Sequence, residues 1–433
     1  MEINREKPSE SNKRARNLVL HIHPVLVRKE SIRFNLTFGL GGMLAVLFLL
    51  QVFTGVLLRF TYVASPDKAY DSILTIQNDI FFGQLIRNMH NWSGILFVLI
   101  AFLHLLRTFY TGAFYDKRRW NWIIGVSLMV LVIFQNFTGY LLPWDQLAYW
   151  AITVSTSILQ YVPVVGERLM EFIRGGENVN ASTLLIFYNF HTAILPLTIV
   201  ILMVFHFWRV RKAGGVVVAE KSSPDMVPSD PDLVLKELVT ALVLIAFILV
   251  LSMFFNAPLQ DRADPAFSPN PAKAPWYFMG VQELLLHFHP FFSAILIPFL
   301  FVGGLIWLPF LHFKEKQQGV WFYTRKGEKL VLIAAVVALI TIPAGILLSE
   351  FVIDVERMLP GIPLIISSGL IPFTAVFVLF ALLLYVVRKK MAPGNNEMIL
   401  FIMSFLMAAY FIFSLTGIFF RGTGMQLMWP WNI

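Results

Sequence analysis

The stretch "IRNMHNWSGILFVLIAFLHLLR", residues 86–107, is apolar enough to lie in a membrane, yet it contains two histidines, His90 and His104. About 20 mostly apolar residues are enough to span the hydrocarbon of a bilayer. An ionisable side chain is costly there, so it indicates a functional site by default. The first question is therefore what these two histidines bind.

The composition of the whole chain is typical of an integral membrane protein. Of its 433 residues, 57% are hydrophobic and only 14% are charged, which is too few charges to cover a soluble globule of this length. The chain contains no cysteine. This excludes disulfides, thiolate metal ligands and any cofactor attached through a cysteine thioether, so histidines and carboxylates must supply the ligands of any metal.

Nine apolar windows predict an all-α integral membrane protein with about nine transmembrane helices. The windows cover residues 34–60, 85–108, 121–142, 184–208, 235–256, 291–311, 329–350, 367–387 and 397–420. The segments between them alternate in charge, and the basic ones are the N-terminus, 107–119, 209–221, 312–329 and 388–390. Because basic loops stay inside, we expect a cytoplasmic N-terminus and an outer C-terminus in a bacterial-type inner (plasma) membrane.

Two segments outside these windows are also interpretable. Residues 1–33 form a basic cytoplasmic segment, within which residues 16–29 are either an amphipathic helix on the inner surface or a disordered arm. Residues 213–231 are rich in Pro, Ser and Asp, which favours a linker. This linker separates a four-helix half, residues 34–212, from the rest of the chain.

The histidines of the second and fourth predicted helices have matching spacings. His90 and His104 are 14 residues apart, and His191 and His206 are 15 apart, so each pair lies on one face of its helix. Both helices run from outside to inside, which pairs His90 with His191 and His104 with His206. Two imidazoles on opposite sides of a flat macrocycle indicate bis-histidine haem, which has no open iron position and is suited to electron transfer.

Glycines on the first and third predicted helices repeat at the same interval. Gly41 and Gly55 are 14 residues apart, and so are Gly125 and Gly139. Helix glycines usually allow close helix packing. Here their repeat matches the histidine layers, so we expect the missing side chains to make room for two large rings, one in each leaflet.

Two arginines lie beside the histidines. Arg87 precedes His90 by one turn and Arg107 follows His104, where haem propionates would need cations. Either arginine could instead be an interfacial residue whose charge reaches the headgroups. Any single intramembrane histidine could likewise serve an interhelical hydrogen bond or a proton relay.

Several motifs resemble cytochrome b of the quinol-oxidising bc1 and b6f complexes. They are "TG" at 54–55, "RNMHNWSG" at 87–94, "GYLLPWDQLAYW" at 139–150 and "NFHTAILP" at 189–196. The resemblance covers most of residues 30–310, and "PWDQ" with the 15-residue histidine interval is more similar to the b6f branch. It implies a b6-like half fused to a subunit IV-like quinol-site half at 232–320. Residues 321–433 would be additional helices and partner surface.

The resemblance also implies a function. The implied function is that of the cytochrome b subunit of a quinol:cytochrome c (or equivalent acceptor) oxidoreductase, a translocase that would run a Q cycle through two b-type haems. Implied partners are a Rieske-type iron-sulfur protein, a c-type cytochrome, quinone, membrane lipid and a second copy in a homodimeric complex, with no nucleic acid. Alternatives are a dihaem anchor subunit of another quinone-linked dehydrogenase and a proton-coupled transporter.

The expected outer quinol site departs from the family pattern. "NPAKAPWYFMGVQELL", residues 270–285, keeps Trp276 and Tyr277 but has Pro275 where the family usually has a glutamate. Glu283 is our candidate for the missing proton acceptor, although it could be an ordinary helix-surface carboxylate. A second departure is Ile186, where an arginine near the outer haem is common. Propionate pairing would then depend more on Arg87.

The resemblance also indicates an inner quinone site. Arg211 matches a basic position after the last haem ligand, and Lys236 with Glu237 matches a Lys-Asp pair that touches quinone. These residues could instead be ordinary positive-inside loop charges. Gly39 stands where the b6f branch attaches an extra haem to a cysteine, so that covalent haem is excluded here.

Overall fold

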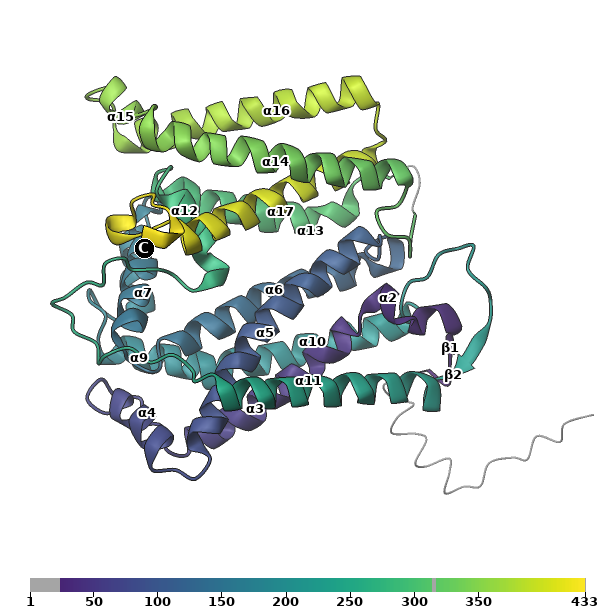
Figure 1. Ribbon diagram of the computed structural model, residues 1–433, viewed down its shortest axis with the longest axis horizontal. Coiled ribbons are helices and arrows are strands. Elements are labelled where there is room, and N and C mark those ends of the chain that lie inside the picture. Colours follow the sequence, from purple (N-terminus) through teal and green to yellow (C-terminus); the bar gives the residue numbers. More distant parts are fainter. Residues whose placement is uncertain (1–23, 314–316, 433) are drawn as a thin grey trace, which may run out of the picture.

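The computed structural model describes residues 24–313 and 317–432. Within these residues, nine helical spans are long and apolar enough to cross a membrane, which confirms the predicted all-α membrane protein (Figure 1). Their main helices are α3 (Leu40–Arg59), α5 (Gly83–Tyr110), α6 (Arg119–Tyr140), α10 (Leu195–Lys212), α11 (Val234–Phe254), α13 (Ile297–Trp307), α14 (Arg325–Phe351), α16 (Ile371–Met391) and α17 (Asn395–Phe419).

Shorter elements connect these helices. They are α2 (Phe34–Thr37), α4 (Ala69–Asn78), α7 (Gln146–Ser157), α8 (Gly166–Arg174), α9 (Ala181–Asn189), α12 (Met279–Leu285) and α15 (Val355–Met358). The predicted first window, 34–60, is in fact two helices, α2 and α3. The chain turns between them at Phe38 and Gly39, which both have a positive φ, a left-handed conformation that no α-helix can contain.

Three of the spans contain a π-helical segment in front of a proline. The segments are Phe190–Ile194, Phe291–Leu296 and Ile365–Leu370, and a proline follows each as the second residue of the next α-helix: Pro196, Pro298 and Pro372. Proline has no N–H to donate to the preceding turn, and its ring clashes with the carbonyl four residues earlier. A one-residue widening of the helix relieves this clash, which is a recurrent origin of π-bulges.

The N-terminal segment pairs with the predicted linker. Strand β1 (Leu26–Arg28) is antiparallel to β2 (Met226–Pro228), with Val27 opposite Val227. The sequence left an amphipathic helix and a disordered arm open for residues 16–29, and the described part is neither, because Leu26–Arg28 is a strand in which Val27 favours an extended chain. Residues 16–23 lie outside the described residues. A short two-stranded sheet thus connects the linker to the segment that precedes α2.

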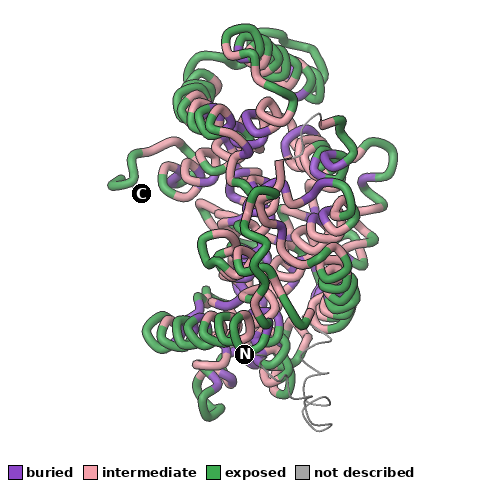
Figure 2. Tube along the Cα trace, turned by 90° about the vertical axis from the view of Figure 1, so that its right-hand side faces the viewer, coloured by how far each residue is buried: buried purple, intermediate pink, exposed green. Residues whose placement is uncertain are grey.

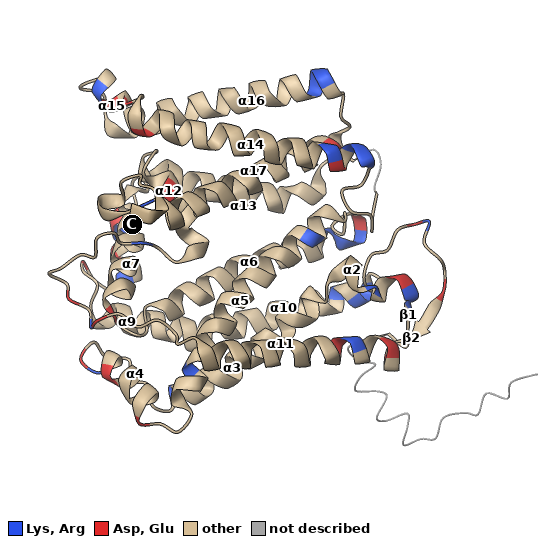
Figure 3. Cartoon of the chain, in the orientation of Figure 1, with Lys and Arg blue, Asp and Glu red and all other residues tan. Residues whose placement is uncertain are grey.

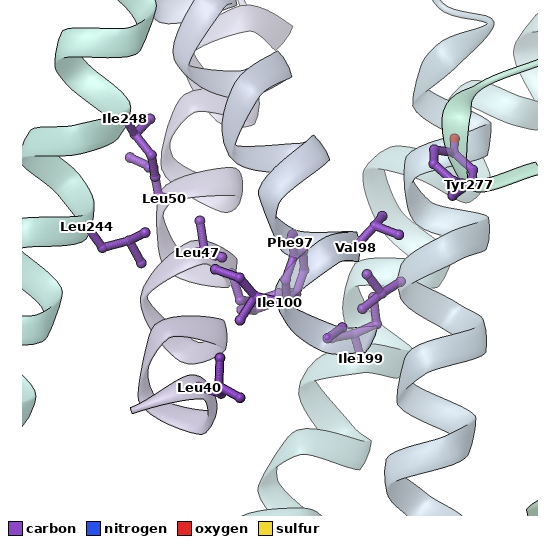
Figure 4. Close-up of a cluster of buried hydrophobic side chains, with 13 residues drawn as sticks. Leu40, Leu47, Leu50, Phe97, Val98, Ile100, Ile199, Leu244, Ile248 and Tyr277 are labelled. Atoms are coloured by element: carbon purple, nitrogen blue, oxygen red, sulfur yellow. The ribbon is translucent and has the colours of Figure 1, made fainter. Parts of the chain in front are cut away.

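The core of the N-terminal half lies between α3, α5, α6, α10 and α11 (Figure 4). Buried leucines of α3 contact Phe97 and Ile100 of α5, with Leu244 and Ile248 of α11 on the other side. Buried residues concentrate inside the bundle, while the outward surfaces of the long helices are exposed (Figure 2). That exposed surface is largely apolar, as expected for helices that face lipid.

Charges gather at the two ends of the helices and leave the middle uncharged (Figure 3). Lys and Arg cluster at the end where α6, α14 and α17 begin and α10 and α16 terminate. The other end carries α4, α8 and α15, each with an acidic residue in its first turn. We call these the basic end and the acidic end of the bundle.

Candidate functional site

The structure brings the four intramembrane histidines together as two pairs. His90 of α5 faces His191, with ring centroids 6.1 Å apart, and His104 of α5 faces His206 of α10 at 6.4 Å. A metal ion bonded to two imidazoles at about 2 Å would hold their ring centres about 6 Å apart. Both pairs therefore have the separation of two ligands of one metal centre.

The π-helical segment explains why unequal histidine spacings produce level pairs. His191 lies inside Phe190–Ile194, and a π-bulge amounts to one extra residue in an α-helix. The 15-residue interval between His191 and His206 is therefore equivalent to the 14 residues between His90 and His104. Without the extra residue, the two helices would present their second histidines about 100° apart in rotation.

A glycine faces each of the four imidazoles, as the repeat in the sequence suggested. A Cβ built at Gly41 would lie 3.4 Å from the His104 ring, one at Gly55 3.2 Å from His90, one at Gly125 3.5 Å from His206 and one at Gly139 2.5 Å from His191. The first and third helices thus approach the imidazole edges closely. The glycines therefore make room for the histidine rings.

The pair nearer the acidic end, His90 with His191, is called the outer pair below, and it has supporting residues that the sequence reasoning missed. The pentapeptides "QVFTG", 51–55, and "QNFTG", 135–139, each end in one of these glycines. Gln51 donates to the His90 carbonyl at 2.6 Å, and Gln135 donates to the His191 carbonyl at 2.8 Å. This repeated Gln-x-Phe-Thr-Gly motif, at the same depth on two helices, was the signal that could have identified them.

The same motif orients the imidazoles. The Thr54 hydroxyl donates to the Leu50 carbonyl, so it can accept from Nδ1 of His90, which is 2.9 Å away. Nδ1 of His191 lies 2.9 Å from the Gln135 carbonyl oxygen, which can only accept. With the proton on Nδ1, each ring keeps the Nε2 lone pair for a metal, which is the usual arrangement of a ligating histidine.

The glycine contacts lead to a prediction. Gly139→Ala should lower the content of the outer cofactor sharply, because a Cβ there comes within 2.5 Å of the His191 ring. Gly125→Ala is the matched control: its Cβ would lie 3.5 Å from the His206 ring, an ordinary contact. Alanine improves helix propensity by up to about 1 kcal/mol at both positions. Cofactor content per purified chain measures the difference, and equal retention in both variants would contradict the assignment.

The two arginines beside the histidines, Arg107 and Arg87, differ in how many of their nitrogens make hydrogen bonds. Arg107 is buried and donates from Nε to the Leu36 carbonyl at 2.8 Å. Its Nη2 is buried with no hydrogen-bond partner among the described residues, so it is suited to an anionic group of a ligand. Arg87 donates from its two terminal nitrogens to the carbonyls of Ala257 and Pro258, at 2.9 and 2.7 Å. It therefore anchors the loop that follows α11.

Trp276 and Tyr277 lie at the acidic end, in a short 3-10 turn before α12. The indole Nε1 and the phenol hydroxyl are both buried without a hydrogen-bond partner in the described part of the chain. Buried polar groups normally have hydrogen-bond partners, so these two groups are available to form hydrogen bonds with a ligand. Burial raises the pKa of Tyr277 far above its usual range, so this hydroxyl is a hydrogen-bonding group rather than a base.

Glu283 does not have the position that the sequence led us to expect. It is fully buried, and its carboxylate accepts hydrogen bonds from Arg421, at 2.6 Å from Nη2 and 3.0 Å from Nε. His287 lies 3.3 Å away, and Arg421 also binds Glu350 at 3.0 Å. Burial by itself raises the pKa of Glu283, but the hydrogen bonds and the positive charge of Arg421 outweigh it and lower the pKa. The carboxylate is therefore held in an ion pair, and its role as the proton acceptor for quinol stays a prediction.

The predicted inner-site residues lie at the basic end. Lys236 donates from Nζ to the Ile32 carbonyl at 3.0 Å, and Glu237 stands beside it in the first turn of α11. Arg211 is in the last turn of α10 and is exposed. The segment around α2 therefore contacts both α11, through Lys236, and α5, through Arg107.

These features define a class: a membrane-embedded helical bundle whose paired histidines and facing glycines form two layers fit for flat metal-containing cofactors. A profile of the family described as Cytochrome b/b6/petB matches residues 27–214. Cytochrome b6 of Porphyra purpurea is 43% identical over 180 residues, 42% of this chain and 84% of that protein. Cytochrome b6 of Heliomicrobium gestii is 43% identical over 192 residues, 44% and 88% of the two chains. The chain belongs to the cytochrome b/b6 family.

The fold of the whole chain has a counterpart among solved structures. A chain of a structure entitled "Hyperthermophilic respiratory Complex III" superimposes with a TM-score of 0.67 at 24% identity, over 94% of this chain and 97% of that one. The similarity therefore extends to the C-terminal helices, which the matched cytochrome b6 sequences do not cover. The family binds b-type haem and serves electron transport in membranes, and without cysteine this chain cannot attach haem covalently.

Proposed function

We propose that the chain is the cytochrome b subunit of a quinol:cytochrome c (or equivalent acceptor) oxidoreductase of the bc1/b6f type. The observation that carries this proposal is the presence of two level histidine pairs, 6.1 and 6.4 Å between ring centroids, each faced by two glycines. Two b-type haems bound there would supply one-electron transfer across the membrane, one near each surface.

The haem ligands in this proposal are His90 with His191 for the outer haem and His104 with His206 for the inner one. The hydrogen bonds at Nδ1 of His90 and His191 support this role, because a proton on Nδ1 would leave the Nε2 lone pair available to a metal. Arg107 has a buried nitrogen to offer a propionate of the inner haem. The residues present therefore fit bis-histidine haem in both layers.

The outer quinol site is proposed at Trp276 and Tyr277. Their unpaired polar atoms could bind the oxygens of a quinol head group, while the surrounding apolar side chains exclude water. Glu283 enters the proposal as the anchor of α12, because Arg421 occupies its carboxylate. The quinol proton would then leave through another acceptor or through water, and Tyr277 would fix the orientation of the quinol.

The inner quinone site is proposed at the basic end, among Arg211, Lys236 and Glu237. A quinone that takes up two electrons must also take up two protons, and Glu237, partly buried in the first turn of α11, is the candidate donor. Lys236 and Arg211 would attract the quinone oxygens. This site and the outer one together would support a Q cycle with proton translocation.

The same proposal includes the partners and the orientation. Electrons would leave to a Rieske-type iron-sulfur protein and then to a c-type cytochrome at the acidic end, in a homodimeric complex. The basic end would face the cytoplasm, which places the N-terminus inside a bacterial-type inner membrane. In this proposal, the linker that contains β2 joins a b6-like half, 34–212, to a quinol-site half, 232–320.

A difference spectrum of the purified complex tests the function. We expect two b-type components per chain in the dithionite-reduced minus oxidised spectrum, and reduction of both by quinol. Absence of any b-type band would support the alternative of a proton-coupled transporter. Two haems that quinol reduces in a preparation without an iron-sulfur protein or c-type cytochrome would favour the dihaem anchor subunit of another dehydrogenase.

A further inference from the structure

One cation at the acidic end lies beside the outer histidine pair and has no part in the site described above. Arg59 is the last residue of α3 and follows Gly55 by four residues. Residues four apart share one helix face, and one turn advances about 5.4 Å. Because a Cβ built at Gly55 would lie 3.2 Å from the His90 ring, Gly55 faces that ring, and Arg59 lies on the same face of α3 one turn farther toward the acidic end.

A tyrosine from another helix holds the Arg59 side chain. Arg59 donates from Nε to the Tyr188 hydroxyl at 3.1 Å, and its guanidinium lies 5.9 Å from the centre of that ring. Tyr188 belongs to α9 and precedes His191 by three residues, so it too lies about one turn outward of a histidine. Arg59 therefore bridges the two helices that flank the outer pair.

Tyr188 is itself fixed in place. Its ring stacks on Tyr62, with centroids 5.6 Å apart and an interplanar angle of 27°. The Tyr62 hydroxyl donates to the Leu142 carbonyl at 2.7 Å. Three aromatic and polar contacts in series thus determine where the guanidinium lies.

Arg87, the other arginine near the outer pair, already uses its terminal nitrogens in hydrogen bonds. Both terminal nitrogens of Arg87 donate to backbone carbonyls, and its side chain is buried. Position 186 is an isoleucine and supplies no charge. Arg59 makes its hydrogen bond through Nε within the described part of the chain, which leaves its two terminal nitrogens for a further acceptor.

We propose that Arg59, positioned by Tyr188, binds a propionate carboxylate of the outer haem. The inference rests on the proposed function, since it requires a haem between His90 and His191. The terminal nitrogens of a guanidinium match a carboxylate in a bidentate geometry. A positive charge beside the haem also favours the reduced state, because reduction adds one negative charge to the site. Arg59 is therefore a haem-binding residue that raises the reduction potential of the outer haem, and Tyr188 is the residue that positions it.

A redox titration of the two b-type bands in the purified complex tests this inference. Arg59→Gln should lower the midpoint potential of the outer haem and leave the inner haem unchanged, because the histidine layers lie about 21 Å apart along α5. Arg59→Lys keeps the charge and should retain most of the wild-type potential. Arg168→Gln removes an exposed cation of α8 at the same end, and it should change neither potential.

Tyr188→Phe is a second variant that keeps every charge. It removes the hydrogen bond that fixes Arg59, so we expect a shift in the same direction but smaller, which is useful if Arg59→Gln does not assemble. An unchanged outer potential in Arg59→Gln, or an equal shift in Arg168→Gln, would overturn the inference. Failure of the proposed function would show differently, as the absence of b-type bands from the wild-type complex.

Discussion

Replacement of His104 by leucine is expected to remove the inner b haem and to leave the outer haem spectrally recognisable. Leucine is similar in size but has no lone pair, so the partner His206 would be left as a single ligand. The ring centroids of His104 and His206 are 6.4 Å apart, and the outer pair lies about 21 Å away along the helix. His191→Leu should have the converse effect and remove the outer haem.

The measurement is the haem content and the difference spectrum of each purified variant. His312→Leu is a suitable control, because His312 is exposed and lies outside the bundle; we expect it to retain both haems. Equal loss of both haems from His104→Leu, with the protein still assembled in the membrane, would contradict the layered arrangement. Loss of the outer haem alone from His104→Leu would contradict the assignment of His104 to the inner haem.

Removal of the Glu283 carboxylate is expected to destabilise the C-terminal half strongly. Glu283 and Arg421 are both fully buried and bind each other through two nitrogens. Removing one partner of a buried ion pair typically costs about 3–5 kcal/mol, and the cost is lower for Glu283→Gln because Arg421 keeps Glu350 as a second partner at 3.0 Å. Glu283→Gln and Arg421→Met should therefore both reduce the yield of assembled complex and its thermal midpoint.

A double variant separates this structural role from proton transfer. Glu283→Leu combined with Arg421→Met replaces the pair by apolar side chains, which is often neutral for stability. Glu350 would lose one contact, but its side chain is 25% exposed and can be hydrated. We expect the double variant to recover both assembly and quinol oxidation per haem.

The opposite outcome is equally informative. A stable double variant whose quinol oxidation stays about 10²-fold low, the loss typical of a missing general base, would show that Glu283 accepts the quinol proton. It would restore the role that the sequence first suggested for this residue. Turnover must be normalised to bound haem, so that poor assembly is not counted as slow chemistry.

Much of the fold follows from local properties of the sequence. Nine apolar windows of bilayer length predict nine crossings, and the helical repeat predicts that His90 and His104 share a face. The alternation of basic and acidic segments agrees with the charge distribution at the two ends of the bundle (Figure 3). These predictions need only residue type and spacing, because hydrocarbon thickness and helix pitch are the same for every chain.

Part of the candidate site could also have been found in the sequence. The Gln-x-Phe-Thr-Gly repeat at 51–55 and 135–139 marks the supports of the outer histidines, and its recognition required only a comparison of two short stretches. The glycine intervals were visible in the same way. The meaning of the repeat, one hydrogen bond to the backbone carbonyl, one to the imidazole and one close approach for each outer histidine, became clear only with the helices in place.

Other features depended on the tertiary structure. The π-bulge before Pro196 lets a 15-residue interval match a 14-residue one, which no fixed helical period predicts. Glu283 pairs with Arg421, 138 residues away in sequence, and no local pattern around Glu283 predicts this contact. The sequence by itself determined the helices and the spacing of their ligands, because both follow from local periodicity. Only the tertiary structure decided which charges are neutralised, since burial brings together partners from distant segments.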